Sequence, residues 1–483
     1  MDYRWKVLVA VGFGTFMATM DFSIVNIALP TLGREFDRPP DVVVWATLTS
    51  SLVVTGLTLT AGRAGDLFGR KRIYVTGWVI FTLGMAIAPF AQTIEQLIAM
   101  RFFQAIGTAL AIANGNAIVT AAFPPNERGR ALGTTGAIVG AGLMSGPILG
   151  GVILDLFDWH AIFYLRVPIG LIAMSLALFI IRESEGEPAG QRRIDVPGAV
   201  LLFATLSTAL LAVNRGTTWG WASPAILSLF AVSAVSLALF LRVESRTASP
   251  VVSLALFKVR SFSVSILSLM LNFMGQSAVT FLMPFYLTRV QDYGTARAGL
   301  VIATVPLMML ILSPVSGMVS DRKGFRHQTT VGLVLVSLGL FSLATLGANT
   351  PVWLIMARLA IIGVGTSVFM SPNSSAVMGA VPLSKLGTAS ASVATSRNIG
   401  NAVGLAISSA VLVGVASATA GVSGVRADQL PSGALLDGVQ VGFVVAGCLS
   451  AIAVVASLAL RPKAEGRPAA STVPPVAAVT RER

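Results

Sequence analysis

Residues 62–70 read Gly-Arg-Ala-Gly-Asp-Leu-Phe-Gly-Arg, and residues 317–324 read Gly-Met-Val-Ser-Asp-Arg-Lys-Gly. Both stretches follow a long apolar run, and both contain the pattern G-x-x-x-D-x-x-G. The aspartates of the two patterns, Asp66 and Asp321, lie 255 residues apart. A pattern of this length in equivalent surroundings indicates an internal repeat.

The composition places most of the chain in lipid. Of the 483 residues, 54% are hydrophobic and only 11% are charged, whereas about 25% of a typical soluble protein is charged. One Cys and two His exclude a disulfide framework and make a His/Cys metal site improbable. No Gly-Lys pair is present to form a phosphate-binding loop. We therefore expect no cofactor, no metal and no nucleic-acid partner, and we assign the net charge of +13 to cytoplasmic loops.

The apolar runs predict fourteen transmembrane helices, since about 20 apolar residues cross a bilayer. The chain then has no room for a large extramembrane domain. The predicted spans are Val7–Leu29, Val42–Ala61, Ile73–Ala91, Ile94–Thr120, Ala131–Leu154, Ile162–Ile181, Val196–Val213, Pro224–Leu241, Phe262–Leu287, Ala298–Ser320, Thr329–Leu346, Pro351–Ser371, Ile399–Val415 and Gly438–Leu460.

The distribution of basic residues predicts the orientation. With the N-terminus inside, cytoplasmic segments hold 24 of the 34 Lys and Arg residues and the outer loops hold six. Because cytoplasmic loops carry an excess of Lys and Arg, both termini are expected in the cytoplasm. We expect a multi-pass protein of the cell membrane. The excess of Arg over Lys, with abundant Ala and Gly, hints at a bacterial source.

Further landmarks extend the repeat and define its halves. Arg101 and Arg358 lie 35 and 37 residues after the two aspartates, and Pro382 follows Pro124 by 258 residues. Such a repeat predicts two bundles of like orientation, related by an axis along the membrane normal. The offset is too long for six spans, so two extra helices are inserted between the bundles. The expected domains are a six-helix bundle over 1–181, linkers with the two inserted helices over 182–260, a second six-helix bundle over 261–460 and a disordered cytoplasmic tail over 461–483.

These features resemble the major facilitator superfamily, and in particular its fourteen-span drug:proton antiporters of EmrB/QacA type. The resemblance rests on the repeated loops, the 6+2+6 layout and the run Met20–Pro30 in span 1. It also rests on Arg101 with Gly107 in span 4 and on Trp159 to Gly170 at the start of span 6. Two positions depart from the family pattern: Arg166 stands where Asn is usual, and Trp159-His160-Ala161 replaces Trp-Arg-Trp.

Asp21 is the one carboxylate well inside a predicted span. A charge at the bilayer centre costs about 2.5–3.5 kcal/mol, so it faces a cavity or a partner. We interpret Asp21 as the proton-coupling residue and Arg101, at similar depth, as its partner. The alternatives are a permanent ion pair that holds span 1 in place and an Arg101 that anchors helix ends to carbonyl groups. Arg358 has no matching acid, and we interpret it as structural.

The repeated loops are candidates for a gate. Resemblance to the family implies a conformational latch. Aspartates between glycines can meet a helix N-terminus or an Arg across the two halves. A purely topogenic basic loop would explain its arginines but not Asp66. The predicted latch residues are Gly62, Asp66, Gly69, Arg70, Arg72, Asp321 and Gly324.

Span 5 is rich in glycine and contains a proline. The family resemblance implies an antiporter motif here, formed by Gly142, Gly146, Pro147, Gly150 and Gly151. Small residues at a spacing of four let helices approach closely, so we expect a rocking interface. Ordinary packing of membrane helices is the alternative.

Candidate substrate contacts are polar or flexible residues at mid-membrane depth, although such a residue taken singly is more often part of the core than a ligand contact. Methionines suit a promiscuous site because they repack around different ligands. The candidates are Met20, Asn114, Asn116, Asn272, Gln276, Met308, Arg397 and Asn398.

Together these observations predict a proton-coupled multidrug efflux antiporter and not an enzyme. It would export bulky hydrophobic or amphipathic compounds by alternating access, as a monomer with protons, substrate and the lipid bilayer as partners. An exporter or flippase of lipid-like molecules and a proton:solute symporter of the same superfamily remain alternatives. A membrane enzyme would need a polar cluster at an interfacial loop, and the sequence contains none.

Overall fold

The computed structural model describes residues 2–183, 193–247, 249–421 and 431–459, and all regular elements within these ranges are helical. The predicted tail over 461–483 lies outside the described residues. The helices of the first half are α1 (Tyr3–Glu35), α2 (Pro40–Val43), α3 (Trp45–Phe68), α4 (Arg70–Ile87), α5 (Ile94–Ala122), α6 (Arg128–Leu156), α7 (Ala161–Tyr164) and α8 (Val167–Ile180). Two helices follow, α9 (Val196–Trp219) and α10 (Pro224–Glu244). The second half comprises α11 (Arg260–Phe285), α12 (Thr295–Ile302), α13 (Thr304–Lys323), α14 (Phe325–Leu343), α15 (Val352–Gly379), α16 (Leu386–Ala420) and α17 (Ser432–Leu458).

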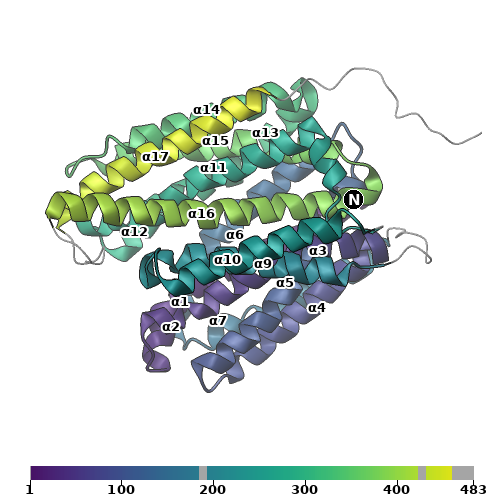
Figure 1. Cartoon of the computed structure of the whole chain (residues 1–483), viewed down its shortest axis with the longest axis horizontal. Helices are drawn as coiled ribbons and strands as arrows, with labels where there is room; N and C mark the ends of the chain where they lie inside the picture. Colours follow the sequence, from purple (N-terminus) through teal and green to yellow (C-terminus); the bar gives the residue numbers. More distant parts are fainter. Residues whose placement is uncertain (1, 184–192, 248, 422–430, 460–483) are drawn as a thin grey trace, which may run out of the picture.

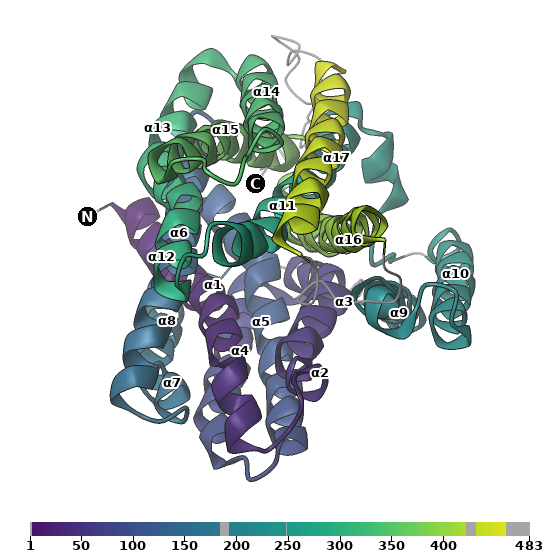
Figure 2. The same cartoon turned by 90° about the vertical axis from the view of Figure 1, so that its left-hand side faces the viewer.

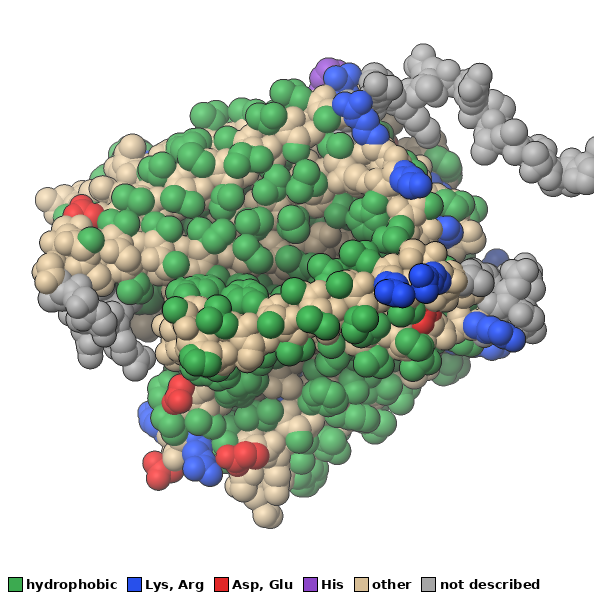
Figure 3. All heavy atoms as spheres, viewed as in Figure 1, with side chains coloured by type: hydrophobic (Ala, Val, Ile, Leu, Met, Phe, Trp, Pro, Cys, Tyr) green, Lys and Arg blue, Asp and Glu red, His purple; other side chains and the backbone are tan. Residues whose placement is uncertain are grey.

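The two halves form separate bundles, with α9 and α10 packed at one side (Figure 2). Each bundle has its own apolar core, which includes Trp78 and Phe81 in the first half and Leu340 and Phe443 in the second. Hydrophobic side chains also cover the outer face between the ends of the helices, while charged side chains gather at the two ends (Figure 3). This distribution is that of a protein whose middle section lies in lipid.

Within the described ranges, thirteen helices are long and apolar enough to cross a membrane. The predicted span Thr329–Leu346 corresponds to α14, which has 19 residues and is not among the thirteen. Its first turn carries Arg326, His327 and Gln328, and these polar residues lower its mean hydropathy. The chain is a multi-pass membrane protein. The length and hydropathy of α14, however, do not by themselves identify it as a membrane-spanning helix.

The predicted span that begins at Ile399 differs most from the helix that contains it. The sequence predicts a span that begins at Ile399, whereas α16 begins at Leu386 and runs for 35 residues. Residues 386–398 are mostly Ala, Ser, Thr and Gly, so they do not form an apolar run. They are helical because α16 packs here against α3 and α5. Eleven residues in succession, Leu386 to Ser396, are buried.

The connections α3–α4 and α13–α14 lie at one end of the molecule, which we call the latch end and which contains Asp66 and Asp321. The glycines of these connections, Gly69 and Gly324, have φ of 102° and 82°. L-residues with a side chain rarely adopt such angles, so glycine permits the tight turn. The N-terminus lies at the latch end, and the two bundles diverge toward the opposite end (Figure 1).

Candidate functional site

Asp21 lies on α1 inside the first bundle, and two arginines bind its carboxylate. Nη1 of Arg101 lies 3.0 Å from Oδ1 and 2.9 Å from Oδ2, and Nη1 of Arg166 lies 2.6 Å from Oδ1. All three side chains are buried. The structure therefore brings the predicted pair Asp21 and Arg101 together and adds Arg166 to it.

Further hydrogen bonds hold both guanidinium groups in place. Arg101 donates to Oε1 of Gln104 at 2.7 Å and to the carbonyl oxygen of Ala46 at 3.3 Å. Gln104 in turn donates to Oδ1 of Asp21 at 3.2 Å, and Arg166 donates to the carbonyl oxygen of Ile162 at 2.6 Å. The cluster thus ties together α1, α3, α5 and the segment that leads into α8.

Sequence reasoning missed Arg166 and Gln104 as members of this cluster. In the sequence, Arg166 stands out only as a departure from the family pattern, although a buried cation needs an anionic partner. Asp21 is the acid in the first half that is available at this depth. Gln104 lies three residues after Arg101, hence on the same face of its helix. Both signals were present in the sequence, but neither showed which way the side chains point.

The ionised cluster carries one negative and two positive charges in a buried site. Each arginine donates hydrogen bonds to the carboxylate oxygens of Asp21. The free-energy cost of burying this charge is therefore offset by two ion pairs. A proton on Asp21 would remove the negative charge and leave two buried cations that repel each other. A change of protonation here is therefore a large local electrostatic event.

The glycines of the predicted antiporter motif face the helix that carries Asp21. A β-carbon on Gly142 would meet Thr19, one on Gly146 would meet Ser23, and one on Gly150 would approach Ile24. Ser23 also donates to the carbonyl oxygen of Gly142 at 3.3 Å. The close contact of α6 is thus with α1 of the same bundle. Pro147 lies within α6 and Gly151 faces open space.

The contact between the two bundles is made by other glycines of α6. A β-carbon on Gly129 would lie 2.6 Å from the carbonyl oxygen of Gly317, and one on Gly140 would lie 2.7 Å from that of Pro306 on α13. Gly62 and Gly387 form the equivalent approach between α3 and α16. These close glycine contacts between the bundles therefore lie nearer the latch end than the predicted motif, whose rocking role stays a prediction.

Asp66 joins the two bundles at the latch end. Its Oδ1 accepts the backbone N–H of Gly387 at 2.8 Å, and its Oδ2 accepts the N–H of Thr388 at 2.8 Å and its hydroxyl at 2.9 Å. Arg70 donates to Oδ1 from Nη2 at 2.8 Å and also donates to the carbonyl oxygen of Leu383. An acid of α3 thus caps the N-terminus of α16, where the helix dipole favours a negative charge.

Asp321 makes the same arrangement with the roles of the bundles exchanged. Its Oδ1 accepts the N–H of Gly129 at 2.7 Å, and its Oδ2 accepts the N–H of Arg130 at 2.8 Å. These donors are in the first turn of α6. The two repeated loops therefore form two equivalent contacts between the bundles, α3–α16 and α13–α6, which we call the latches after their predicted role.

One predicted latch residue lies elsewhere. Arg72 is on the exposed surface of α4 and pairs with Glu183 at 3.4 Å, so the structure places it on the first bundle alone. Gly69 and Gly324 act through their backbone angles at the turns, as described above.

The structure distributes the predicted substrate contacts over different environments. Met20 is buried in the apolar core of the first bundle, and Asn114 donates to the carbonyl oxygens of Ala61 and Leu110 at 3.2 and 3.0 Å. Both are thus used for packing within a bundle. Asn272 is fully buried, and its side-chain N and O have no hydrogen-bond partner in the described part of the chain.

The other candidates are half-buried. Gln276 of α11 donates to Oγ1 of Thr366 on α15 at 2.8 Å, and the carbonyl oxygen of Met308 accepts from Ser367 at 3.3 Å. The remaining three are Asn116, Arg397 and Asn398. The structure gives Arg397 no ion pair or hydrogen bond with any residue it describes, which leaves a cation in the middle of α16 without an anion.

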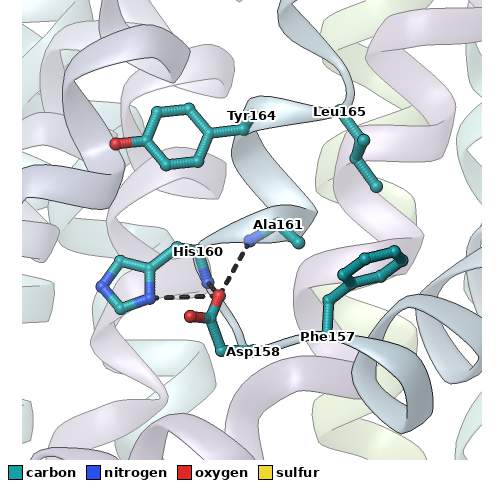
Figure 4. A pocket seen from close by; sticks show the side chains of 6 residues that line it. All are labelled: Phe157, Asp158, His160, Ala161, Tyr164 and Leu165. Carbon is teal, nitrogen blue, oxygen red and sulfur yellow. Dashed lines mark hydrogen bonds and ion pairs between the residues drawn. The ribbon is translucent and has the colours of Figure 1, made fainter.

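A surface pocket lies apart from these residues, at the α6–α7 connection (Figure 4). Phe157, Tyr164 and Leu165 line it, and Asp158 accepts the backbone N–H groups of His160 and Ala161 at 3.0 and 3.3 Å. The carboxylate of Asp158 is therefore used to cap the short helix α7. This pocket contains none of the predicted site residues.

Comparison with known proteins agrees with this arrangement. Residues 11–405 match the family described as Major Facilitator Superfamily. The chain is 37% identical over 408 residues to the riboflavin transporter RibZ of Clostridioides difficile, covering 84% of this chain and 88% of that one. It is 33% identical over 413 residues to the multidrug resistance protein Stp of Mycobacterium tuberculosis, covering 85% of this chain and 76% of that one.

A solved structure shows the same fold. The crystal structure of the human organic anion transporter MFSD10 superposes with a TM-score of 0.66 at 15% identity, covering 95% of this chain and all of that one. The family and these relatives are membrane transporters and not enzymes. The chain is a member of the Major Facilitator Superfamily.

Proposed function

We propose that this protein is a proton-coupled antiporter that exports bulky hydrophobic or amphipathic compounds by alternating access. The observation that carries the proposal is the buried carboxylate of Asp21 between Arg101 and Arg166. We take the chain to be a fourteen-span member of EmrB/QacA type, in which α14 also crosses the membrane and the latch end lies in the cytoplasm. The excess of Lys and Arg in segments at that end supports this orientation.

In the proposed cycle, both latches hold the cytoplasmic end closed while the opposite end is open. Asp21 takes up a proton from outside, and Arg101 and Arg166 lose their common anion. The cluster rearranges, and α1 shifts against the glycines of α6. Because α6 also contacts α13 of the other bundle, this shift reaches the interface between the bundles. The latches then open, the proton leaves toward the cytoplasm and substrate binds in its place.

The proton gradient is sufficient to drive such export. A proton that enters down a membrane potential of 100 mV, inside negative, supplies about 2.3 kcal/mol. This corresponds to roughly a 50-fold substrate gradient for each proton. Exchange of one proton for a monovalent cation moves no net charge, so only the pH difference would drive it. A neutral or anionic substrate would use the membrane potential as well.

The charges within the helices guide the expected substrate class. Asp21 faces two arginines, and Arg358 and Arg397 of the second bundle have no ion pair within the described residues. This positive excess disfavours dications and suits neutral, anionic or monocationic compounds. Drugs and riboflavin, which appear in the names of the relatives, are suitable first probes.

Proton release on substrate binding tests the proposal. Purified protein in weakly buffered detergent solution is mixed with a dye substrate and with riboflavin, and pH is recorded. We expect release from the wild type, none from Asp21→Asn, and normal release from Asp437→Asn, a matched control at an exposed acid of α17. Uphill export by Asp21→Asn in proteoliposomes at the wild-type rate would overturn the assignment. Proton uptake with substrate would instead indicate symport, and selective transport of a lipid analogue would indicate a lipid exporter.

A further inference from the structure

The inserted helices end in two buried acids at the latch end. Asp195 immediately precedes α9, and Glu244 is the last residue of α10. Their residues are only 8% and 4% exposed. Neither acid belongs to the Asp21 cluster or to the two latches. Two buried carboxyl groups in one place need an explanation, because each costs free energy unless it is paired or neutral.

Each acid uses one oxygen to hold the backbone and leaves the other without a partner. Oδ1 of Asp195 accepts the N–H of Gly198 at 2.9 Å, and Oε1 of Glu244 accepts the N–H of Val252. Oδ2 of Asp195 and Oε2 of Glu244 are buried and have no hydrogen-bond partner among the residues the structure describes. Both oxygens adjoin the point where Gly198 would carry a β-carbon, and Oε2 of Glu244 lies 3.2 Å from it. The two free oxygens therefore face the same small space.

A shared proton satisfies this geometry. Two carboxylates that share a buried site do not both ionise, because like charges repel strongly there. The helix dipoles decide which acid is neutral. Asp195 caps the N-terminus of α9, which stabilises a negative charge, whereas Glu244 ends α10, where a negative charge is disfavoured. The proton thus belongs on Oε2 of Glu244, from which it can be donated to Oδ2 of Asp195.

The charged groups nearby place this pair next to the α3–α16 latch. Arg63 of α3, one residue after the latch glycine Gly62, is buried. Its positive charge favours the ionised form of Glu244, but less strongly than burial and the charge of Asp195 oppose that form. On the side of the second bundle, Lys385 donates to Oγ of Ser253 at 3.2 Å, in the segment that Glu244 holds through Val252. The other charges of this latch, Asp66 and Arg70, bind one another and α16 as described above.

Apolar contacts connect the inserted helices to both bundles at the same place. One buried cluster contains Leu59 of α3, Leu202 of α9, Phe240 of α10 and Ala391 of α16, together with Val252. Among the described residues, α9 and α10 belong to this cluster alone, while a separate cluster joins Leu256 of the following segment to Leu386 of α16 and to Leu132 of α6. The inserted helices therefore support one latch of the two, and they do so through the segment that carries the acid pair.

We propose that Asp195 and Glu244 form a second proton-binding site, which holds one shared proton while the α3–α16 latch is closed and releases it when the latch opens. With the proton bound, Glu244 joins the ends of α9 and α10 and keeps Val252 in place beside the latch. Without it, two carboxylates repel each other and the support loosens. Alkaline pH on the latch side therefore favours opening. The inference rests on the proposed alternating access, but not on Asp21 as the coupling acid.

Distances between the bundles at the latch end test this site directly. Spin labels are attached to Cys at positions 126 and 384, in the Asn126→Cys, Ser384→Cys, Cys448→Ser background, because both positions are exposed and lie one on each bundle. The full chain in nanodiscs is measured by pulsed electron paramagnetic resonance over an acid-to-alkaline series. We expect the closed fraction of the wild type to fall as the pH rises. Glu244→Gln, which keeps a donor toward Asp195, should stay closed at all pH values, and Asp437→Asn should behave as the wild type.

A wild-type pH dependence in Glu244→Gln would overturn the proposal. An infrared measurement covers the case in which this variant fails to fold. It uses Asp21→Asn, so that Asp21 does not contribute to the spectrum. We expect the carbonyl band of one protonated carboxyl group, lost over the same pH range in which the latch opens, and shifted in Glu244→Asp. A spectrum with no such band would also overturn the proposal, whereas failure of proton-coupled export alone would affect only the role of Asp21.

Discussion

The guanidinium of Arg166 lies 2.6 Å from Oδ1 of Asp21, closer than Arg101, whose Nη1 lies 3.0 and 2.9 Å from the two carboxylate oxygens. The anion of α1 is therefore bound from two sides, by α5 and by the residue that precedes α8. Each cation favours the ionised form of the acid, so in the proposed cycle both would influence the pH at which Asp21 takes up a proton.

Removal of one cation should move the pH dependence of transport. In Arg166→Asn, Asp21 keeps Arg101 but loses an ion pair, so it should take up a proton at higher pH. We expect the pH profile of transport in proteoliposomes to shift to alkaline by about one pH unit or more. Arg297→Asn removes an exposed arginine outside the cluster and serves as the control. An unchanged profile in Arg166→Asn would contradict a direct role of this arginine at Asp21.

The two latches should differ in strength. Asp66 accepts two backbone N–H groups, the hydroxyl of Thr388 and the guanidinium of Arg70, whereas the bonds of Asp321 are to two backbone N–H groups. Loss of a capping side chain costs about 1–2 kcal/mol. We expect Asp66→Ala to shift the protein toward a state open at the latch end, and Asp321→Ala to shift it less.

Hydrogen exchange can assign each effect to its own helix. Asp66→Ala should speed exchange of the Gly387 and Thr388 amides, and Asp321→Ala should speed that of Gly129 and Arg130. Exchange that increases equally at both helix starts in each variant would mean that the latches open only together. Equal transport effects of the two variants would argue against the predicted difference in strength.

Two glycines of the motif in α6, Gly146 and Gly151, provide a matched test of the contact with α1. A β-carbon on Gly146 would meet Ser23, two residues after Asp21, while Gly151 has open space around it. Gly146→Ala should therefore displace α1 and reduce transport strongly, with a stability loss of about 1–3 kcal/mol from overpacking. Gly151→Ala should leave transport near the wild-type level and favour the helix slightly. Transport and thermal stability are measured on both variants, and equal behaviour would exclude the contact as the cause.

Asn114 and Arg397 should separate packing from substrate recognition. Asn114 makes two hydrogen bonds to carbonyl groups at the α3–α5 contact, so Asn114→Ala should lower stability by about 1–2 kcal/mol without altering substrate preference. Arg397 has no partner among the described residues, so Arg397→Gln should leave stability unchanged and weaken transport of anionic relative to neutral compounds. Competition between an anionic and a neutral dye measures the preference. A changed preference between the two dyes in Asn114→Ala would indicate that Asn114 contacts the substrate after all.

Local patterns in the sequence predicted much of this protein. Long apolar runs predict membrane helices because the bilayer excludes unpaired backbone groups, and this requirement acts on each segment separately. The repeated loops predicted two bundles, and the two aspartates do lie in equivalent positions between them. The depth of Asp21 in the first run predicted a buried acid, and Arg101 is its partner. Polar or small-residue segments were less predictable: α16 begins thirteen residues before the expected Ile399 because neighbouring helices bury its first turns.

Tertiary structure decided which faces of the helices meet. Gly142 and Gly146 contact α1 while Gly129 contacts α13, although all three belong to one glycine-rich helix. The rotation of each helix determines such contacts, and it depends on every neighbour at once, so no single stretch of sequence contains it. For the same reason the second arginine at Asp21 and the acid pair beside the α3–α16 latch were found only in the folded chain. Sequence alone set which segments enter the membrane; the packing of those segments set which charges meet inside it.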